Sequence, residues 1–323
     1  GMIGKIFSMK CKDNSFRAKL HDNYWSFNAK GIFPELNITH SALLSRLPDL
    51  AETDSLRSEI SKLRRFYINL TINADALMDV RSKQGQKKLF IDEIKRRLKN
   101  RKGFSFIRLG DGEQYVFNIQ AGLSELNRIH SREMYWWNTL LDLTKRTEIA
   151  ADVISAITMA DALGIPSAFR FARDINFAKD SIEDMPMSRD LLGLIQELEK
   201  RQESLSARFY LEDRAHQFLF GKVDVLDLFD SAKKCIIVGC WSKEQLGLPQ
   251  HHVDLQVIQT PAQHKLGLGN ENTLALPYVY KETANLVQKY AEPGALVLVG
   301  AGVIGKYFIK TAAMKGAVAL DIG

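Results

Sequence analysis

The first two thirds of the chain show mainly the hydrophobic spacing of amphipathic helices. Apolar residues recur every three or four positions in 41–80 and again in 87–100, which predicts helices with one buried face. The segment 131–163 is interpreted as mostly helical up to a stop at 164–166. The segment 188–230 is interpreted as further helix, broken near Ser206 and Gly221. Residues 1–40 contain many aromatic side chains but no clean period. We therefore expect an irregular N-terminal stretch followed by helices.

The last third of the chain alternates between short apolar runs and helical segments. A similar apolar run stands earlier, in 104–110, where the helical period ends. The expected strands are 104–110, 234–239, 255–258, 295–299 and 317–320, and the later ones are separated by expected helices at 273–290 and 303–314. Nearly continuous apolar strands that alternate with helices are typical of a parallel sheet covered on both faces. The sequence therefore predicts an α/β fold with a Rossmann-like, mostly parallel sheet and a helical N-terminal appendage.

Composition places the chain among ordinary globular proteins. Hydrophobic residues make up 46% and charged residues 25%, which excludes a disordered chain or a disulfide-stapled small domain. Neither a signal peptide nor an apolar run of about 20 residues, as a membrane helix needs, is visible. The three cysteines, Cys11, Cys235 and Cys240, lack the paired spacing of a zinc site. Cys235 and Cys240 flank a strand-like run, so we interpret these two as core thiols and expect a cytoplasmic location.

The positive charge is concentrated near the N-terminus. The whole chain has a net charge of +6, but residues 1–102 carry 21 basic and 11 acidic residues, so the remainder is net acidic. Together with a break at 84–86, this asymmetry predicts an appendage over 1–85 and a catalytic domain over 86–323. The basic region is a candidate for peripheral docking on acidic lipid headgroups at the inner face of the membrane, whereas a solvated helix face is the simpler interpretation. We expect no nucleic-acid partner.

The motif Arg108-Leu-Gly-Asp-Gly-Glu113 follows the first expected strand. Ligands of open α/β sheets bind outside the carboxyl ends of the strands. Asp111 and Glu113, separated only by Gly112, can both face one point if the turn bends, which suits a hard cation completed by substrate phosphates. Arg108 can bind a phosphate or pair with a carboxylate. The alternative is a tight turn whose acids cap the next helix.

A second glycine-rich turn, Gly300-Ala-Gly-Val-Ile-Gly305, follows a late strand. It fits the GxGxxG pattern, and Asp321 lies at the end of the next strand, which is close to a dinucleotide fingerprint. Such glycines let the backbone approach a diphosphate at a helix N-terminus. A dinucleotide-binding fold normally opens with this unit, so the turn supports a diphosphate better than NAD. A glycine turn that merely allows close helix–strand packing is the alternative.

Three isolated residues are weaker candidates. Arg170 follows an expected strand-edge loop, and Arg208 lies near a helix start, so either can bind a substrate anion or be an ordinary surface charge. His216 is a candidate general base, although a structural histidine is the more frequent case in helical surroundings. The sequence contains no GxSxG, HExxH or P-loop motif.

The R-x-G-D-G-E turn and the C-terminal Leu298-Val-Gly-Ala-Gly…Ala319-Leu-Asp-Ile-Gly323 unit together resemble the GT-D-fold glycosyltransferases of bacterial surface-polysaccharide and glycoprotein glycan assembly. The resemblance covers roughly 86–323. It implies a Rossmann-like domain that binds a nucleotide-sugar donor, usually a UDP-sugar, and a divalent metal, Mn²⁺ or Mg²⁺. The metal ligands it implies are Asp111 and Glu113. The remaining site residues that it implies are Arg108, Gly110, Gly112, Gly302 and Lys306.

The resemblance therefore predicts a metal-dependent hexosyltransferase that acts on a glycan acceptor, which in some cases is lipid-linked. Two other functions stay open at this stage. One is an NAD- or S-adenosylmethionine-binding Rossmann enzyme that uses Gly300–Gly305 and Asp321. The other is a non-catalytic nucleotide-binding scaffold of polysaccharide assembly.

Overall fold

A computed structural model describes residues 39–51, 53–71, 77–81, 83–174, 188–246, 254–266 and 274–323. Within them lies one sheet whose strand order is β1-β4-β3-β2-β8-β7-β5-β6. Every pair of neighbouring strands is parallel, which confirms the predicted fold class. The strands are β1 (Leu77–Met78), β2 (Phe104–Arg108), β3 (Ala162–Ile165), β4 (Phe209–Glu212), β5 (Lys234–Gly239), β6 (Asp254–Gln259), β7 (Ala295–Gly300) and β8 (Val318–Asp321).

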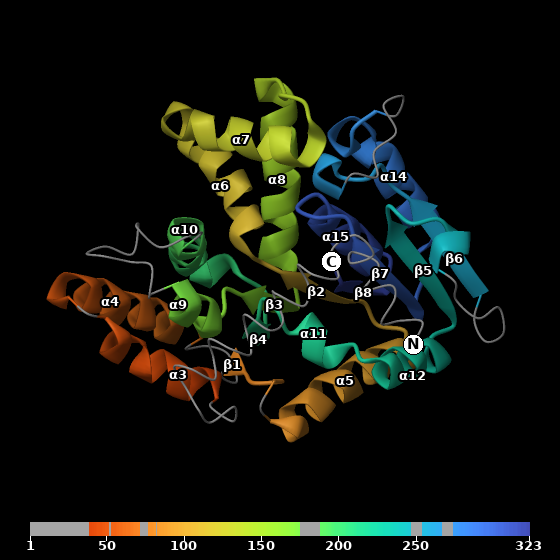
Figure 1. Ribbon diagram of the computed structural model, residues 1–323. Helices are drawn as coiled ribbons and strands as arrows, with labels where there is room; N and C mark the ends of the chain where they lie inside the picture. The colour runs from red at the N-terminus through yellow and green to blue at the C-terminus, as the bar shows by residue number, and fades with distance from the viewer. Residues whose placement is uncertain are drawn as a thin grey trace.

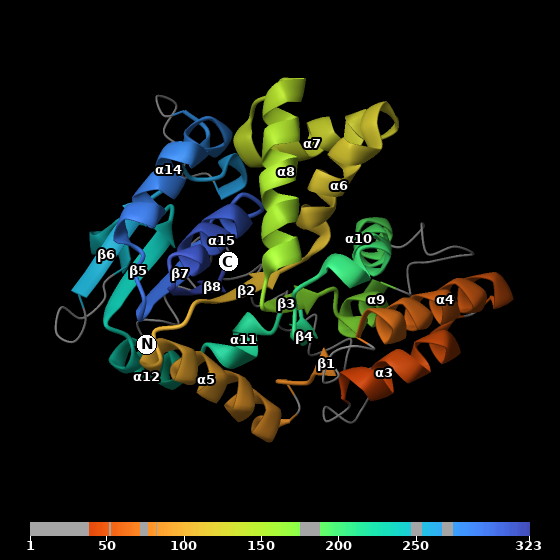
Figure 2. The same ribbon diagram turned by 180° about the vertical axis from the view of Figure 1, so that it is seen from behind.

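Helices cover both faces of this sheet (Figures 1 and 2). The first group lies N-terminal to β3: α3 (His40–Arg46), α4 (Asp54–Thr71), α5 (Gln84–Lys99), α6 (Gln114–Ala121), α7 (Leu126–Trp137) and α8 (Leu143–Met159). The second group follows β3: α9 (Ala168–Asp174), α10 (Ser188–Lys200), α11 (His216–Leu219), α12 (Lys222–Ser231), α13 (Lys243–Leu246), α14 (Leu276–Tyr290) and α15 (Gly305–Met314). Helices α5, α11 and α12 lie on one side of the sheet, whereas α8, α14 and α15 lie on the other.

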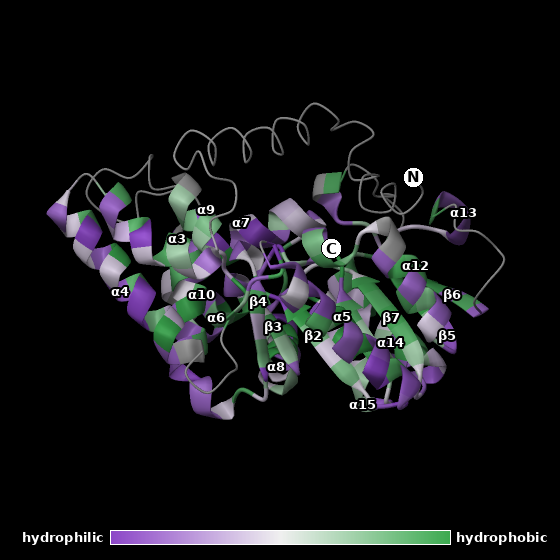
Figure 3. Ribbon diagram, turned by 90° about the horizontal axis from the view of Figure 1, so that it is seen from below, coloured by the Kyte–Doolittle hydropathy of each residue, from purple (hydrophilic) through white to green (hydrophobic). Residues whose placement is uncertain are grey.

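The strands divide the hydrophobic interior into two cores, one on each face. In β7, Val297 and Val299 join the core beneath α8 and α15, while Leu296 and Leu298 join the core beneath α5 and α12. This alternation follows from the two-residue period of a strand. Both faces of the central strands are therefore apolar, as their colouring in Figure 3 shows.

Two strands occupy segments that the sequence predicted as helical, so that part of the prediction is wrong. The expected helix 131–163 is interrupted at Asn138, which adopts a left-handed conformation with φ of 52°, and its end forms the buried strand β3. Strand β4 lies within 188–230, just after the break expected near Ser206, where the sequence predicted helices and no strand. Strands of four buried residues carry too little period to be distinguished from the helices beside them.

The described part of the predicted appendage packs against the rest of the chain. Leu63 and Tyr67 on α4 lie in the larger of the two cores, and the Tyr67 hydroxyl donates a hydrogen bond to the carbonyl oxygen of Pro166. Strand β1 pairs with β4 and forms an edge of the sheet. A boundary at residue 85 stays a prediction, but α3, α4 and β1 share the core and the sheet of the remaining chain.

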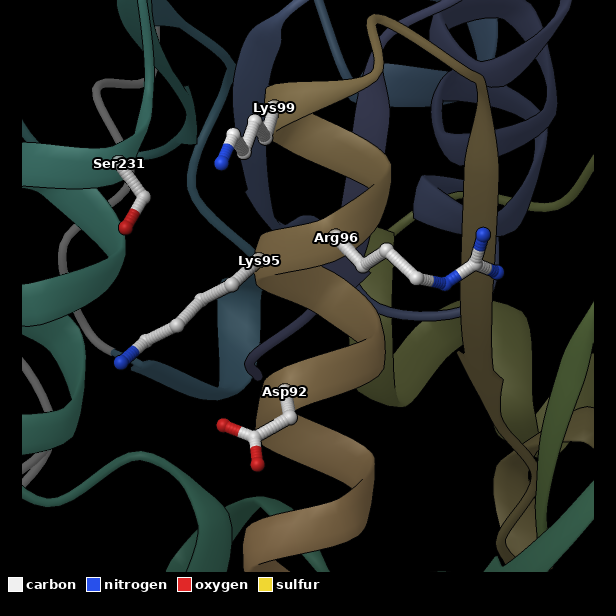
Figure 4. A pocket seen from close by; sticks show the side chains of 5 residues that line it. All are labelled: Asp92, Lys95, Arg96, Lys99 and Ser231. Carbon is white, nitrogen blue, oxygen red and sulfur yellow. The ribbon is translucent and has the colours of Figure 1, made fainter.

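Many basic groups of the N-terminal region are already paired on α5. Arg96 and Arg97 both bond Glu93, and Lys95 bonds Asp227 of α12. A hollow of about 410 Å³ beside α5 and α12 (Figure 4) is lined by Asp92, Lys95, Arg96, Lys99 and Ser231. Part of the positive charge on α5 is thus compensated within the protein, and docking on acidic lipids stays a prediction.

The sequence analysis also made predictions about membrane-spanning helices and about the cysteines. None of the helices in the described ranges combines the length and the apolar character that crossing a membrane requires. Cys235 is buried, as expected for a core thiol, and Cys240 is only partly buried, whereas Cys11 lies outside the described residues.

Candidate functional site

Charged side chains gather where four neighbouring strands end. Arg108 is the last residue of β2, Asp321 is the last residue of β8, and Asp213 directly follows β4. Ser167 and Arg170 lie just beyond β3, at the start of α9. Because these strands are parallel neighbours, all of these residues lie at the carboxyl edge of the sheet, where α/β proteins bind ligands.

The motif turn after β2 is short and stabilised by its own side chain. Residues Asp111–Glu113 form a 3₁₀ turn, and a Glu113 carboxylate oxygen accepts a 2.6 Å hydrogen bond from the Gly110 backbone N–H. A Cβ atom at Gly110 would lie 3.2 Å from Arg170, and one at Gly112 would lie 3.3 Å from the Trp136 ring. The two glycines therefore let the turn lie close to an arginine and an aromatic ring.

Asp111 is held between two arginines. Arg170 donates from Nη2 to Oδ1 at 2.8 Å, and Arg132 donates from Nη2 to Oδ2 at 3.0 Å. Burial alone would raise the pKa of Asp111, but the two guanidinium groups outweigh it and hold that pKa below its usual range. Asp111 is therefore ionised at neutral pH.

Glu113 and Asp321 share the buried ammonium group of Lys306. Its Nζ lies 2.6 Å from an Asp321 oxygen and 3.0 Å from a Glu113 oxygen. Burial alone would lower the pKa of Lys306, but the two carboxylates raise it above its usual value. Asp321 also accepts a 3.1 Å hydrogen bond from the backbone N–H of Arg108. Lys306 thus joins α15, β8 and the motif turn.

His216 lies beside Arg108 at the start of α11. An Arg108 Nη1 nitrogen is 3.0 Å from Nε2 of His216 and 3.2 Å from the Asp213 carbonyl oxygen to which it donates. An imidazole nitrogen that accepts from a guanidinium uses its lone pair in that contact. The structure brings His216 to the site, but this contact does not support its predicted role as a general base.

Four residues of the cluster were missed by the sequence analysis, among them Arg128, whose guanidinium bonds Asp190. Asp213 accepts a 2.6 Å hydrogen bond from Arg170 and a 3.1 Å hydrogen bond from the Ser167 backbone N–H. Arg132 bonds Asp190 at 2.9 Å in addition to Asp111. Asp213 follows a strand that was predicted as helix, and Arg132 and Asp190 belong to no local motif, so only the fold brings these residues together.

Arg170 and Arg208, the two predicted anion-binding arginines, lie at different edges of the sheet. Arg170 is buried in the centre of the cluster. Arg208 is exposed and precedes β4, so it lies at the opposite, amino edge of the sheet.

The second glycine turn also lies at the carboxyl edge, after β7. Gly302 has φ of 61° and fits closely against Gln263, because a Cβ atom at this position would lie 2.3 Å from that side chain. The N–H of Gly305 donates to the carbonyl oxygens of Ala301 and Gly302. These contacts match the alternative of a tight packing turn. The diphosphate role of Gly300, Gly302 and Gly305 stays a prediction.

The charges of the cluster are balanced. It contains five cations, Arg108, Arg128, Arg132, Arg170 and Lys306, and five carboxylates, Asp111, Glu113, Asp190, Asp213 and Asp321. Most of these side chains are largely buried, so each charge depends on its partners. When a charged ligand binds here, some of these side chains would therefore exchange an ion-pair partner for the ligand.

The chemistry of Asp111 and Glu113 fits a divalent cation in part. Both are carboxylates on one short turn, and an ionised carboxylate offers more lone pairs than the one hydrogen bond that each oxygen accepts here. The described residues include no group of three or more His, Cys, Asp or Glu side chains arranged to hold a metal. These two carboxylates therefore suit a cation whose remaining ligands come from substrate phosphates and water, as is common for Mg²⁺.

Comparisons with known proteins give similarity at the level of the fold. No family model and no curated protein matches the chain. A solved structure described as the highly conserved domain of unknown function 1792, with a distinct glycosyltransferase fold, is 17% identical and has a TM-score of 0.39. A selenomethionine-substituted structure of domain of unknown function 1792 is also 17% identical, with a TM-score of 0.38. Each similarity covers 72% of this chain and 76% of the other.

We draw no correspondence between individual residues from a similarity of this level.

Proposed function

We propose that this protein transfers a sugar from a nucleoside-diphosphate sugar to a glycan acceptor. The observation that supports the proposal is the cluster of Arg108, Arg132, Arg170 and Lys306 around the acidic motif turn, at the carboxyl edge of a parallel sheet. Guanidinium groups bind phosphate oxygens with charge-assisted, often bidentate hydrogen bonds. We propose more specifically that the donor is a UDP-hexose and that the acceptor is a surface-polysaccharide or glycoprotein glycan, including lipid-linked ones.

The cations of the site have a defined task in such a reaction. When the bond between the sugar and the diphosphate breaks, negative charge grows on the leaving diphosphate. Arg132 and Arg170 lie within hydrogen-bond distance of Asp111, where that diphosphate would bind. Positive groups that are already oriented stabilise developing charge without the cost of reorganising water.

Asp111 and Glu113 would hold the divalent cation, Mn²⁺ or Mg²⁺. A bound divalent cation supplies Lewis-acid stabilisation of phosphoryl oxygens. Because Arg170 and Arg132 keep the pKa of Asp111 low, this carboxylate is ready to bind a cation across the neutral pH range. We assign no general base, since His216 already accepts from Arg108 in this arrangement.

A thermal-shift panel tests the proposal. Each of UDP, GDP, NAD and S-adenosylmethionine is added with and without Mn²⁺, because a ligand that binds only the folded protein raises its melting temperature by an amount that increases with affinity and concentration. We expect a nucleoside diphosphate to give the largest shift and Mn²⁺ to increase it. Asp111→Ala should remove the increase. Asp227→Ala, which changes an ion pair between α12 and α5, is the matched control.

Three results would contradict the proposal or restrict it. A metal-independent shift with NAD or S-adenosylmethionine alone would favour a different Rossmann enzyme. Nucleoside diphosphate binding with neither hydrolysis nor transfer of the sugar from UDP-sugars would indicate a nucleotide-binding scaffold. The absence of any shift with a nucleoside diphosphate would overturn the proposal itself.

A further inference from the structure

Two arginines of the site are each held between two carboxylates, and they share one of them. Arg170 bonds Asp111 and Asp213, while Arg132 bonds Asp111 and Asp190. Asp111 therefore occupies one donor of each guanidinium group at the same time. The other carboxylate of each pair anchors the arginine to a different element, Asp213 after β4 and Asp190 in α10.

Both arginines keep binding capacity beyond these contacts. A guanidinium group has five N–H donors. In the described part of the chain, the buried Nε of Arg170 has no hydrogen-bond partner. The guanidinium of Arg132 lies over the Trp136 ring, 5.6 Å from its centre. Arg132 is also partly exposed, with 24% of its side chain accessible, so a ligand can reach it.

Asp213 and Asp190 would hold the two arginines in position while Asp111 is replaced by another partner. If Asp111 releases both arginines, Arg170 still has Asp213 and Arg132 still has Asp190. The released donors point at the place that Asp111 had occupied. An incoming diphosphate replaces one carboxylate with anionic oxygens, so each guanidinium exchanges one charge-assisted hydrogen bond for another.

We propose that Arg132 and Arg170 form a diphosphate clamp that Asp111 holds closed in the ligand-free protein and releases when the diphosphate binds. The inference rests on the proposed function, since it names the groups that would bind the donor. It makes Asp111 a competitor of the diphosphate as well as a candidate metal ligand. A released Asp111 carboxylate needs a new cation, so binding of a divalent cation and of the diphosphate should favour each other through this residue.

The test measures the binding of inorganic pyrophosphate by calorimetry in the absence of metal. Asp111→Asn keeps the shape of the side chain but removes the charge that holds both arginines. We expect pyrophosphate to bind about tenfold more tightly to this variant than to the unaltered protein, equivalent to about 1.4 kcal/mol. Arg132→Gln should bind it about tenfold more weakly. A variant far from the site, Asp227→Asn, should bind like the unaltered protein.

Two controls separate release of the arginines from a simple loss of negative charge. Glu113→Gln removes a charge from the same turn but leaves both arginine pairs intact, so its gain should be clearly smaller than that of Asp111→Asn. In the double variant Asp111→Asn with Arg132→Gln, the two effects on pyrophosphate affinity should not add. Loss of the Asp111 charge can then release only Arg170, because Arg132 has been replaced. If Asp111→Asn does not fold, Asp190→Asn gives a second test: it removes the anchor that keeps Arg132 in position and leaves Arg132 paired with Asp111, so it should weaken pyrophosphate binding about threefold.

The outcomes distinguish this inference from the proposed function. Unchanged or weaker pyrophosphate binding by Asp111→Asn, or an equal gain in Glu113→Gln, would overturn the clamp even if nucleotides bind. The predicted responses to pyrophosphate, combined with no binding of any nucleoside diphosphate, would support the clamp and overturn the nucleotide-sugar donor. If the unaltered protein and all variants bind neither ligand, both proposals are wrong.

Discussion

Lys306 shows at the residue scale how the site is held together. Its ammonium group is 2% exposed and neutralises Asp321 and Glu113, which come from a strand end and from the motif turn. A buried ion pair is not in itself strongly stabilising, but removing one partner leaves an uncompensated charge in the interior. The resemblance implied that Lys306 belongs to the site, and the structure shows that it bonds carboxylates there.

Replacing Lys306 should therefore destabilise the whole protein. We expect Lys306→Met to lower the free energy of unfolding by about 3–5 kcal/mol at neutral pH, because two buried carboxylates lose their cation. Urea denaturation followed by circular dichroism measures this change. Lys310→Met is the matched control, since Lys310 lies one turn further along α15 and bonds only the Ser155 hydroxyl among the described contacts. A loss below about 1 kcal/mol in Lys306→Met would contradict the role.

The contribution of Asp321 should make this stability dependent on pH. Burial alone would raise the pKa of Asp321, but Lys306 and Arg108 hold it below its usual value. A carboxyl group with a depressed folded-state pKa stabilises the fold above its unfolded pKa of about 3.9, and this stabilisation is lost as the pH falls through the folded value. The difference in stability between the unaltered protein and Lys306→Met should thus shrink below about pH 4. A difference that stays constant from neutral pH to pH 3 would contradict this assignment.

At the element scale, the connections decide how closely helices approach the sheet. Gly103 links α5 to β2, and a Cβ atom there would lie 2.5 Å from the backbone carbonyl oxygen of Ala313. Gly85, in the first turn of α5, has no atom within 4 Å of the same hypothetical position. Both glycines precede β2, but only at Gly103 does the backbone come so close that a Cβ atom has no room.

This contrast gives a paired prediction. Gly103→Ala should destabilise the fold by about 1–3 kcal/mol, because a backbone oxygen cannot move aside as a flexible side chain can. Gly85→Ala should be neutral or stabilise α5 by up to about 1 kcal/mol, since alanine has the higher helix propensity. Thermal unfolding of both variants measures the difference. Equal effects in the two variants would show that the close approach at Gly103 has no energetic consequence.

At the scale of the whole molecule, α4 belongs to the larger core. Leu63 is completely buried there together with Trp136, Trp137 and residues of α8 and α10. The basic N-terminal region was predicted as an appendage, but these contacts link its described helices to the elements around the site. Stability of α4 and stability of the sheet should therefore be coupled.

Leu63→Ala tests this coupling. We expect a loss of about 2–5 kcal/mol from the cavity it creates, in a single transition. Circular dichroism and tryptophan fluorescence, to which Trp136 and Trp137 contribute, should give the same midpoint. Leu89→Ala is the control, because Leu89 on α5 is 65% exposed. A separate early transition in circular dichroism alone would show instead that α4 unfolds as an independent unit.

The sequence alone determined the elements whose signals are local. The strand at 104–108 and the three late strands β5, β7 and β8 are runs of buried apolar residues, and α14 and α15 have clear helical periods. The motif turn was recognisable because its two glycines and two acids are adjacent in the chain. Period and spacing of this kind depend on neighbouring residues, so they can be read without the fold.

Only the tertiary structure decided which charges meet. Asp111 pairs with Arg132 and Arg170, which are 21 and 59 positions away in the sequence, and Asp213 enters the site because β4 adds to the sheet beside β3. Hydrogen bonds act over about 3 Å of space, whatever the separation along the chain. The sequence thus predicted the acidic turn and named Arg170 as a candidate, whereas the strand order brings Arg170 to that turn and the packing of α7 brings Arg132 there.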